Sequence, residues 1–167
     1  MNDVVRNTLE GLCLGPIQSS GNLAVIPILN GDANGPEYLT LGAALAEKLI
    51  AITEVSQGGS VPEVRVVNKG DRPVLLLDGE ELAGAKQNRV LNATILVASL
   101  SETIVDVSCT ERGRWHHVSK EFNDSDVVMA RGIRAGKNRA VLQSLKAGRW
   151  FQADQGAIWD SIDELAD

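Results

Sequence analysis

Apolar and polar positions alternate over several short segments in the middle of the chain, which is the period of a β-strand with one buried face. These segments cover residues 22–29, 61–67, 73–77, 89–97 and 103–111. The connections between neighbouring segments are short, and the turn NKGDRP after residue 67 is an example. Short connections favour antiparallel pairing. The pattern therefore predicts a β-rich core over about residues 22–115.

A helical pattern interrupts these strand segments at residues 40–50, with the sequence TLGAALAEKLI. Thr40 is a residue type that caps helix N-termini. Leu41, Leu45, Leu49 and Ile52 fall on one stripe when they are placed on a helix, which is the pattern of an amphipathic element. We therefore expect one helix N-terminal to most of the strands.

The last third of the chain predicts further helices. Residues 138–147 have an apolar side formed by Leu142 and Leu145, and Gly148 is a suitable stop. A final amphipathic helix follows Asp154 as its cap. We therefore predict an α+β fold: an antiparallel β core, either a sandwich or an open barrel, with one N-terminal helix and with C-terminal helices packed on it. The chain 1–167 is expected to be a single domain with a helical part over about 120–167.

A polar insert at residues 79–88 separates two apolar runs, although an ordinary hairpin turn needs only about two to five residues. If residues 89–97 and 103–111 form a hairpin with a five-residue loop, their more apolar faces coincide. This register pairs Leu91 with Cys109 and Arg89 with Glu111. It brings the insert and the continuation RGRWHH to one end of the hairpin, where the insert builds one wall of a polar pocket.

The side chains that this register gathers are the candidate site. Glu81 and Glu111 are the candidate catalytic carboxylates, since two carboxylates near an arginine can separate their pKa values and transfer protons. The candidate ligand-binding residues are Glu80, Lys86, Gln87, Asn88, Arg89, Arg112 and Arg114. The alternative is a structural ion-pair network that closes the end of the sheet, with the amides of Gln87 and Asn88 satisfying loop backbone groups.

Three other features have a functional and a structural interpretation. Cys109 lies near cationic residues that would activate a thiol, but the register directs it into the core, where a cysteine acts as a small hydrophobe. The stretch 131–149 carries six basic residues, and no acidic residue occurs between Val127 and Ala153. It could hold phosphates, or it could be a solvated helix face neutralised by the acidic C-terminus. No spacing of His, Cys, Asp or Glu supports a metal site.

Composition narrows the function classes. The net charge of −6 argues against general nucleic-acid binding. No apolar run approaches the ~20 residues of a membrane helix, and the N-terminus lacks the pattern of a secretory leader. Two cysteines without a CxxC motif are typical of reduced thiols and predict a cytoplasmic location. We expect neither nucleic acid nor membrane as a partner, and we include a homo-oligomer among the expected assemblies.

The blocks GEELAGAKQNR and SCTERGRW are long and ungapped. Through them, the chain resembles the ADP-ribosylglycohydrolase and rhodanese-phosphatase associated protein domain family, most strongly over residues 52–115. The resemblance implies a role near NAD and ADP-ribose metabolism by association. Members of this family often continue beyond the position where this chain ends, so the chain also fits a truncated form of a longer protein.

These observations lead to three functional hypotheses. The first is a binding domain for a phosphate-bearing nucleotide, with ADP-ribose or an NAD derivative as the class that the resemblance implies. The second is a non-catalytic protein-interaction module. The third is a hydrolase that uses Glu81 or Glu111 as general base. The sequence identifies no cofactor.

Overall fold

The computed structural model describes residues 3–30, 35–55 and 62–166. The chain divides into two compact units, Met1–Pro36 and Glu37–Asp167. The predicted α+β class is confirmed, with antiparallel sheets, an N-terminal helix and two C-terminal helices. The boundary near residue 36 has no counterpart among the sequence patterns, and a single domain over 1–167 stays a prediction. No helix in the described part of the chain is long and apolar enough to cross a membrane.

The smaller unit contains one helix and two antiparallel strand pairs. Its elements are α1 (Asp3–Glu10), β1 (Leu12–Leu14), β2 (Gln18–Ser20), β3 (Leu23–Val25) and β4 (Ile28–Asn30). Strand β1 pairs with β4, and β2 pairs with β3. The single strand predicted over residues 22–29 is therefore two strands on either side of Pro27, because a proline cannot donate to a strand ladder. Its carbonyl still accepts from the Gly15 amide at 2.8 Å.

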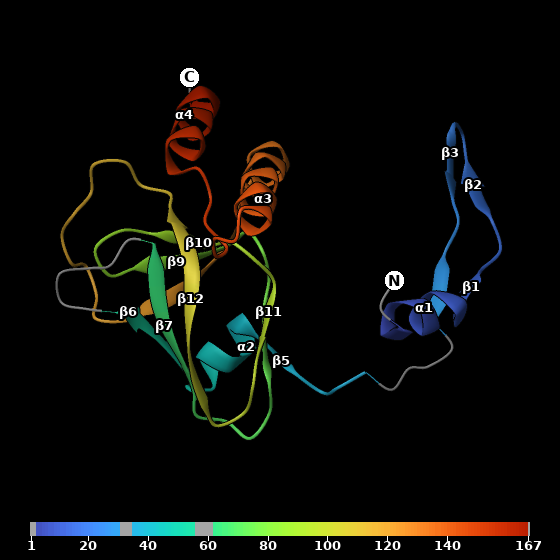
Figure 1. Ribbon diagram of the computed structural model, residues 1–167, viewed down its shortest axis with the longest axis horizontal. Coiled ribbons are helices and arrows are strands. Elements are labelled where there is room, and N and C mark those ends of the chain that lie inside the picture. The colour runs from blue at the N-terminus through green and yellow to red at the C-terminus, as the bar shows by residue number, and fades with distance from the viewer. Residues whose placement is uncertain (1–2, 31–34, 56–61, 167) are drawn as a thin grey trace. The chain divides into compact units, whose positions relative to one another are not determined.

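The larger unit is built on a six-stranded antiparallel sheet (Figure 1). Its strands are β6 (Ile50–Glu54), β7 (Glu63–Asn68), β9 (Glu80–Gly84), β10 (Arg89–Leu91), β12 (Ser101–Cys109) and β13 (Phe122–Val128). Their order is β13-β9-β10-β12-β7-β6. The two edge strands, β13 and β6, contact each other, so the sheet curls toward an open barrel. Val61 of the predicted strand 61–67 lies outside the described residues.

A three-stranded sheet and a short helix complete the core. The sheet contains β5 (Leu39–Thr40), β8 (Val74–Leu76) and β11 (Ile95–Val97), and helix α2 (Leu41–Ala46) contacts both sheets. Leu41, Ile52, Val66 and Leu76 are fully buried in this core. The core depends on aliphatic side chains, and Phe122 is its only aromatic member among the described residues.

Helix α2 is shorter than the helix predicted over residues 40–50. Thr40 caps it as predicted, because its hydroxyl accepts from the Ala43 amide at 3.4 Å. The helix ends at Ala46, and Lys48 has a positive φ of 57°, which a helix cannot continue through. Residues Ile50 and Ile52 then belong to strand β6, where β-branched side chains pack well.

The hairpin register predicted from sequence is wrong. Residues 89–97 do not form one strand, because β10 pairs with β12 whereas β11 pairs with β8. In the observed register Arg89 lies across from Cys109 and Leu91 across from Val107. This is a shift of two residues, which preserves the buried face of each strand but removes Glu111 from the position opposite Arg89.

The break between β10 and β11 has a polar cause. The Asn92 side chain donates to the Phe151 carbonyl at 2.9 Å and accepts from the Ser108 hydroxyl at 2.8 Å. The Thr94 hydroxyl accepts from the Asp78 amide at 3.0 Å. Asn92 thus still contacts β12 through Ser108, but the other contact of its side chain and that of Thr94 lead to Phe151 and Asp78. Beyond Asn92 the chain leaves β12 and pairs with β8 as β11.

The polar insert at residues 79–88 contains strand β9 and a tight turn into β10. The turn requires a glycine at position 84 for two reasons. Its φ of 128° is one that other residues rarely adopt, and a Cβ there would lie only 2.4 Å from the Ser119 hydroxyl and 3.0 Å from the Glu121 carbonyl oxygen. The insert is thus an additional strand of the sheet with a turn that lies directly against residues 119–121.

The C-terminal part begins with a strand and not with a helix. Strand β13 occupies part of the predicted helical region 120–167, followed by α3 (Arg131–Lys146) and α4 (Gln155–Ala166). Helix α3 starts seven residues earlier than the predicted start at 138, despite Gly132 and Gly136. Gly148 follows it with φ 72°, as a C-terminal stop requires. Asp154 caps α4 by accepting from the Ala157 amide at 3.1 Å, as predicted.

One amide side chain closes two turns at the end of β7. The Nδ2 group of Asn68 donates to the Arg72 carbonyl and to the Ala98 carbonyl, each at 2.9 Å. Its Oδ1 accepts from the Gly70 amide at 3.0 Å. Asn68 is 1% exposed, so this end of the sheet is closed by buried hydrogen bonds.

Candidate functional site

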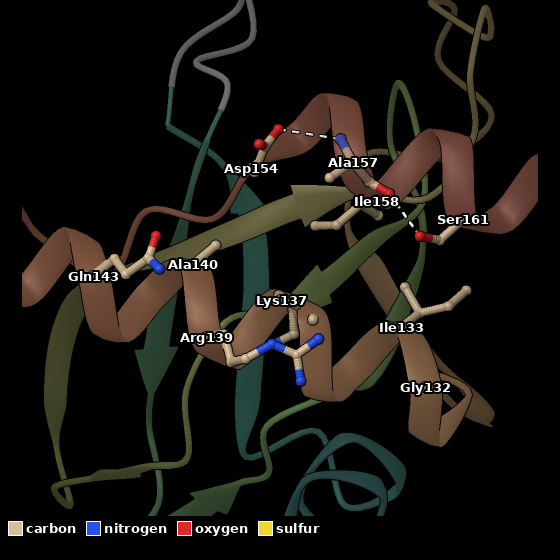
Figure 2. A pocket seen from close by; sticks show the side chains of 11 residues that line it. Gly132, Ile133, Lys137, Arg139, Ala140, Gln143, Asp154, Ala157, Ile158 and Ser161 are labelled. Atoms are coloured by element: carbon tan, nitrogen blue, oxygen red, sulfur yellow. Dashed lines mark hydrogen bonds between the residues drawn. The ribbon is translucent and has the colours of Figure 1, made fainter.

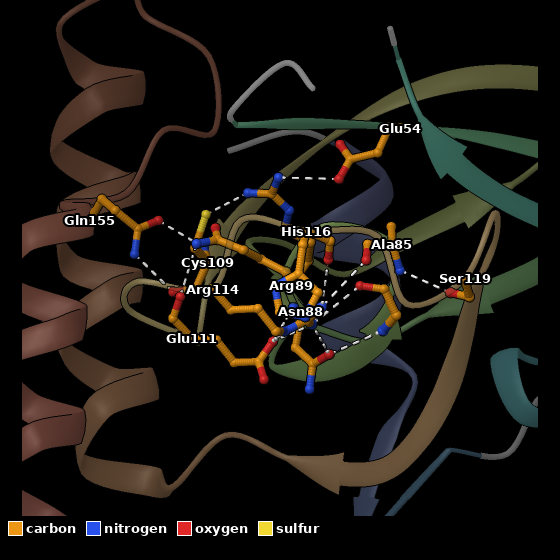
Figure 3. A network of polar contacts seen from close by, with 12 residues as sticks. Glu54, Ala85, Asn88, Arg89, Cys109, Glu111, Arg114, His116, Ser119 and Gln155 are labelled. Atoms are coloured by element: carbon orange, nitrogen blue, oxygen red, sulfur yellow. Dashed lines mark hydrogen bonds and ion pairs between the residues drawn. The ribbon is translucent and has the colours of Figure 1, made fainter. Parts of the chain in front are cut away.

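Most of the predicted site residues do gather at one end of β10 and β12 (Figure 3). We call the group formed by Lys86, Gln87, Asn88, Arg89, Glu111 and Arg114 the rim. Residues 86–88 come from the turn between β9 and β10, Arg89 is the first residue of β10, and Glu111 and Arg114 follow the end of β12. Six of the nine predicted site residues therefore lie together, Glu80, Glu81 and Arg112 lie elsewhere, and a role of any of them in binding or catalysis stays a prediction.

Glu111 pairs with Arg114 instead of Arg89. The Glu111 carboxylate accepts from the Asn88 amide at 2.8 Å and from Arg114 Nε at 2.6 Å. Arg114 also donates to the Asn88 side-chain oxygen at 3.0 Å, and Gln87 Nε2 donates to the Glu111 carbonyl at 2.9 Å. The hydrogen bond from Arg114 lowers the pKa of Glu111, which makes this carboxylate a weak general base.

Arg89 lies deeper than the rest of the rim. It is 0% exposed, and its guanidinium contacts the Cys109 thiol and, at 3.4 Å, the Glu54 carboxylate. The Trp115 ring centroid is 5.9 Å from Arg89 Cζ and 5.2 Å from Lys86 Nζ, within the range of cation–π attraction. Arg89 Nε and Glu54 Oε2 are buried without a hydrogen-bond partner in the described structure.

Cys109 contacts Arg89 through its thiol and Gln155 through its backbone. Burial raises the pKa of its thiol, although the guanidinium of Arg89 acts in the opposite direction. Its backbone amide donates to Gln155 Oε1 at 2.7 Å, and Gln155 Nε2 donates to the Cys109 carbonyl at 2.8 Å. The Gln155 side chain therefore binds both backbone groups of Cys109, as a neighbouring strand would, and joins α4 to β12. This thiol lies in the interior, as the sequence indicated.

Three predicted residues lie away from the rim. Glu80 folds back onto its own turn, where its carboxylate accepts from the Leu77 amide at 2.8 Å, and burial raises its pKa. Arg112 forms exposed ion pairs with Asp160 and Asp163 of α4, at 3.6 and 3.0 Å. Glu81 accepts from the Thr110 hydroxyl at 2.7 Å.

A pocket of about 400 Å³ has Glu81 and Glu111 in its lining, so both predicted catalytic carboxylates border the same space. We call it the carboxylate pocket. Its remaining wall is mainly apolar and comes from β10, β13, the start of α3 and the side of α4. These lining residues are Val90, Val127, Val128, Met129, Ala130, Ile133 and Ile162, with Thr110 beside the carboxylates. The volume lies in the range of small-molecule sites, about 300–1,000 Å³.

The N-terminus of α3 borders this pocket through Met129, Ala130 and Ile133. Ala130 is the N-cap and offers no side-chain hydrogen bond, and the first turn carries no acidic residue. The first amide groups of a helix lack intrahelical acceptors and carry the positive end of the helix dipole. This end of α3 is therefore favourable for a negatively charged group.

A second charged cluster, which the sequence did not indicate, fixes α3 to the sheet. Lys137 is 2% exposed; its ammonium group contacts the Asp78 carboxylate and donates to the Leu91 and Asn92 carbonyls at 3.0 and 3.1 Å. Arg134 Nε and Asn138 Nδ2 also donate to Asp78, each at 2.8 Å.

Burial alone would raise the pKa of Asp78, but the hydrogen bonds from Lys137, Asn138 and Arg134 lower it. Burial lowers the pKa of Lys137. Part of the basic stretch 131–149 is thus neutralised by Asp78, in the turn between β8 and β9, whereas the sequence suggested the acidic C-terminus. The one signal in the sequence was an aspartate directly after the apolar run LLL.

The chain belongs to the family described as the ARG and Rhodanese-Phosphatase-superfamily-associated Protein domain, whose model matches residues 11–167. This confirms the resemblance seen in the blocks GEELAGAKQNR and SCTERGRW. Neither the curated proteins nor the solved structures include a significant match to the chain. The family is described by the proteins with which its members are associated, and this description leaves the chemistry to be inferred from the site.

Proposed function

We propose that the larger unit binds a phosphate-bearing nucleotide ligand of the ADP-ribose or NAD class in the carboxylate pocket. The observation that carries the proposal is the combination of apolar walls, two carboxylates and an uncapped helix N-terminus around one space of about 400 Å³. The association in the family description points to the same ligand class.

The apolar wall suits the base of a nucleotide. Val127, Val128, Met129 and Ile162 offer aliphatic and thioether surface, on which a flat heterocycle buries area without a specific hydrogen-bond pattern. Val127 and Val128 are 52% and 54% exposed. Burial of these side chains by a ligand would therefore remove apolar surface from water.

The carboxylates suit the ribose. Ionised carboxylates only accept hydrogen bonds, and ribose hydroxyls are the donors that an acidic residue recognises in dinucleotide sites. Hydrogen bonding from Arg114 lowers the pKa of Glu111 and thereby favours its accepting form. If the site also performs hydrolysis, the general base is Glu81, because Glu111 is committed to Arg114 and Asn88.

The α3 N-terminus suits the phosphates. Anions bind at helix N-termini because free amide groups and the helix dipole act together. Arg131 begins this helix and adds a positive charge. A nucleotide with its base along β13 would direct its phosphates toward this end.

A binding measurement on the full chain tests the proposal. Isothermal titration calorimetry with ADP-ribose, NAD, AMP and inorganic phosphate should show binding of at least one nucleotide. A ligand at about 100 times its dissociation constant should raise the free energy of unfolding by about 2.7 kcal/mol. The absence of both a binding signal and stabilisation with all of these compounds would contradict the proposal and favour a protein-interaction module.

Two variants locate the binding. Glu81→Gln should weaken nucleotide binding about tenfold, because a ribose hydroxyl loses an ionised acceptor. Val128→Glu places a negative charge on the apolar wall and should weaken it further. Glu102→Gln is the matched control, because this exposed carboxylate lies near the opposite end of β12 and pairs with Arg65. Equal affinities for all four proteins would place the ligand elsewhere.

A further inference from the structure

A second hollow region lies over α3, apart from the carboxylates. It consists of two spaces of about 350 and 280 Å³ that share Ala140, Gln143 and Asp154 in their linings. We call the two together the α3 groove. Figure 2 shows the larger space, with Arg139, Ala140 and Gln143 of α3 along one side and Ala157, Ile158 and Ser161 of α4 along the other.

One buried polar group beside this groove has no partner. Ser144 lines the smaller space and is 3% exposed, and its hydroxyl has no hydrogen-bond partner among the described residues. A buried hydroxyl without a partner costs about 1–3 kcal/mol. A ligand that forms a hydrogen bond with the Ser144 hydroxyl would remove this cost.

Two arginines in the groove carry charge that the described residues do not neutralise. Arg139 lines the larger space and Arg149 the smaller one. The ion pairs in the described structure do not include either guanidinium. By contrast, Arg134 on the same helix is paired with Asp78. Two unpaired guanidinium groups favour binding of a phosphoryl group, with which arginine makes charge-assisted hydrogen bonds.

Glycines keep the groove open. Gly132 and Gly136 lie within α3 and line the larger space. A Cβ at Gly132 would meet no atom within 4 Å, and a Cβ at Gly136 would meet only the Arg139 guanidinium at 3.9 Å. Glycine inside a helix is unfavourable relative to alanine, and no neighbouring atom explains it at these positions. The missing side chains leave room for something that approaches the helix closely.

We propose that the α3 groove is a second binding site and that its ligand is a small phosphorylated sugar. Arg139 and Arg149 hold the phosphoryl group. The Ser144 hydroxyl and the amides of Gln143 and Gln152 bond the sugar hydroxyls. Asp154, whose carboxylate already caps α4, accepts from a further hydroxyl and disfavours a ligand that carries negative charge along its whole length.

Calorimetric titration of the full chain with ribose 5-phosphate, glycerol 3-phosphate, inorganic phosphate and ribose tests this site. We expect the sugar phosphate to bind more tightly than phosphate alone and ribose to give no signal. Arg139→Ala and Arg149→Ala should each weaken binding at least about tenfold, because each removes charge-assisted hydrogen bonds. Arg72→Ala, an exposed arginine that pairs with Glu47, is the matched control and should leave the affinity unchanged.

Gly136→Ala separates binding from folding. This variant should raise the midpoint of thermal unfolding, since alanine favours the helix, while it weakens sugar-phosphate binding by filling the groove beside Arg139. A destabilised protein could not produce this combination.

The proposal is overturned if the sugar phosphates do not bind, or if they bind equally well to the two arginine variants. Glu81→Gln should not change sugar-phosphate binding. Because this variant tests only the carboxylate pocket, a failure of the nucleotide proposal and a failure of this one give different results.

Discussion

Arg89 and Lys137 are both buried cations of the larger unit, yet their surroundings differ. Lys137 Nζ has acceptors on Asp78, Leu91, Asn92 and Asn138, enough for all three of its hydrogens. Arg89 has five donor hydrogens, and the described structure provides hydrogen-bond partners only at Cys109 and Glu54. Its Nε remains without a partner there, and so does Glu54 Oε2.

The difference teaches what each cluster does for the protein. Removing one partner from a fully satisfied buried ion pair leaves an uncompensated charge and is strongly destabilising. The Lys137 cluster therefore holds α3, and with it the α3 N-terminus, against β10 and the turn that contains Asp78. The Arg89 cluster contains a buried donor and a buried acceptor without partners, which lowers the stability of the fold. This cluster therefore contributes less to stability than its buried charges suggest.

Replacement of Lys137 by methionine should have the largest effect. Lys137→Met leaves Asp78 with a buried carboxylate that lacks its main partner, and we expect the free energy of unfolding to fall by about 3–5 kcal/mol. Urea denaturation monitored by tryptophan fluorescence measures this change. Lys146→Met makes the same substitution at an exposed position of the last turn of α3 and should change stability by less than about 0.5 kcal/mol. Similar effects of the two variants would show that the Asp78 contact contributes little.

A double-mutant cycle on Arg89 should give an intermediate effect. Arg89→Met combined with Glu54→Gln should show a coupling energy of about 0.5–3 kcal/mol, the range for groups in direct contact. The cycle of Arg89→Met with Glu111→Gln should give a smaller coupling, because Glu111 pairs with Arg114. The reverse order would support the pairing predicted from sequence against the observed register.

The pH dependence of stability is the most specific test of the Asp78 cluster. Asp78 has a pKa below its ordinary value of 3.8 in the folded protein. Its contribution is therefore present above pH 3.8 and is lost as the pH falls through that value toward the folded pKa. Asp78→Asn should reduce stability at neutral pH and weaken the loss of stability in acid.

Asp106 is the matched comparison. Burial, with the nearby Glu63 charge, raises its pKa in the folded protein above 3.8. Its ionised form is a cost at neutral pH, and this cost is relieved as the pH falls through the folded pKa toward 3.8. Asp106→Asn should therefore raise stability at neutral pH, with no gain below pH 3.8. Urea midpoints between pH 3 and 8 would contradict this interpretation if both variants shifted in the same direction.

The sequence allowed the fold class to be predicted, because strand alternation and helix capping depend on local periodicity. Alternation located β7, β8, β10, β11 and β12, and helix capping located Thr40 and Asp154 correctly. Such features are encoded within a few residues of one another. The polar cluster was instead located by pairing the segments 89–97 and 103–111, and β10 does pair with β12, with a register shifted by two residues.

Pairings between distant segments could not be predicted in the same way. Arg89 meets Glu54, thirty-five positions away, and Lys137 meets Asp78 across fifty-nine positions. Neither pair has a spacing that a strand or helix period reveals. The register error arose because residues 89–97 were treated as one strand, whereas the side chains of Asn92 and Thr94 bind segments that the sequence pattern does not connect.

The amide of Asn68 has a consequence for how this protein can change over evolution. Because a single side chain holds the turns at residues 70–72 and at residue 98, an inserted or deleted residue in one turn would displace the other as well. Length variation is therefore constrained at that end of the sheet. New specificities should arise instead at the opposite end of β12, where the 79–88 segment and the C-terminal helices can diversify without disturbing this closure.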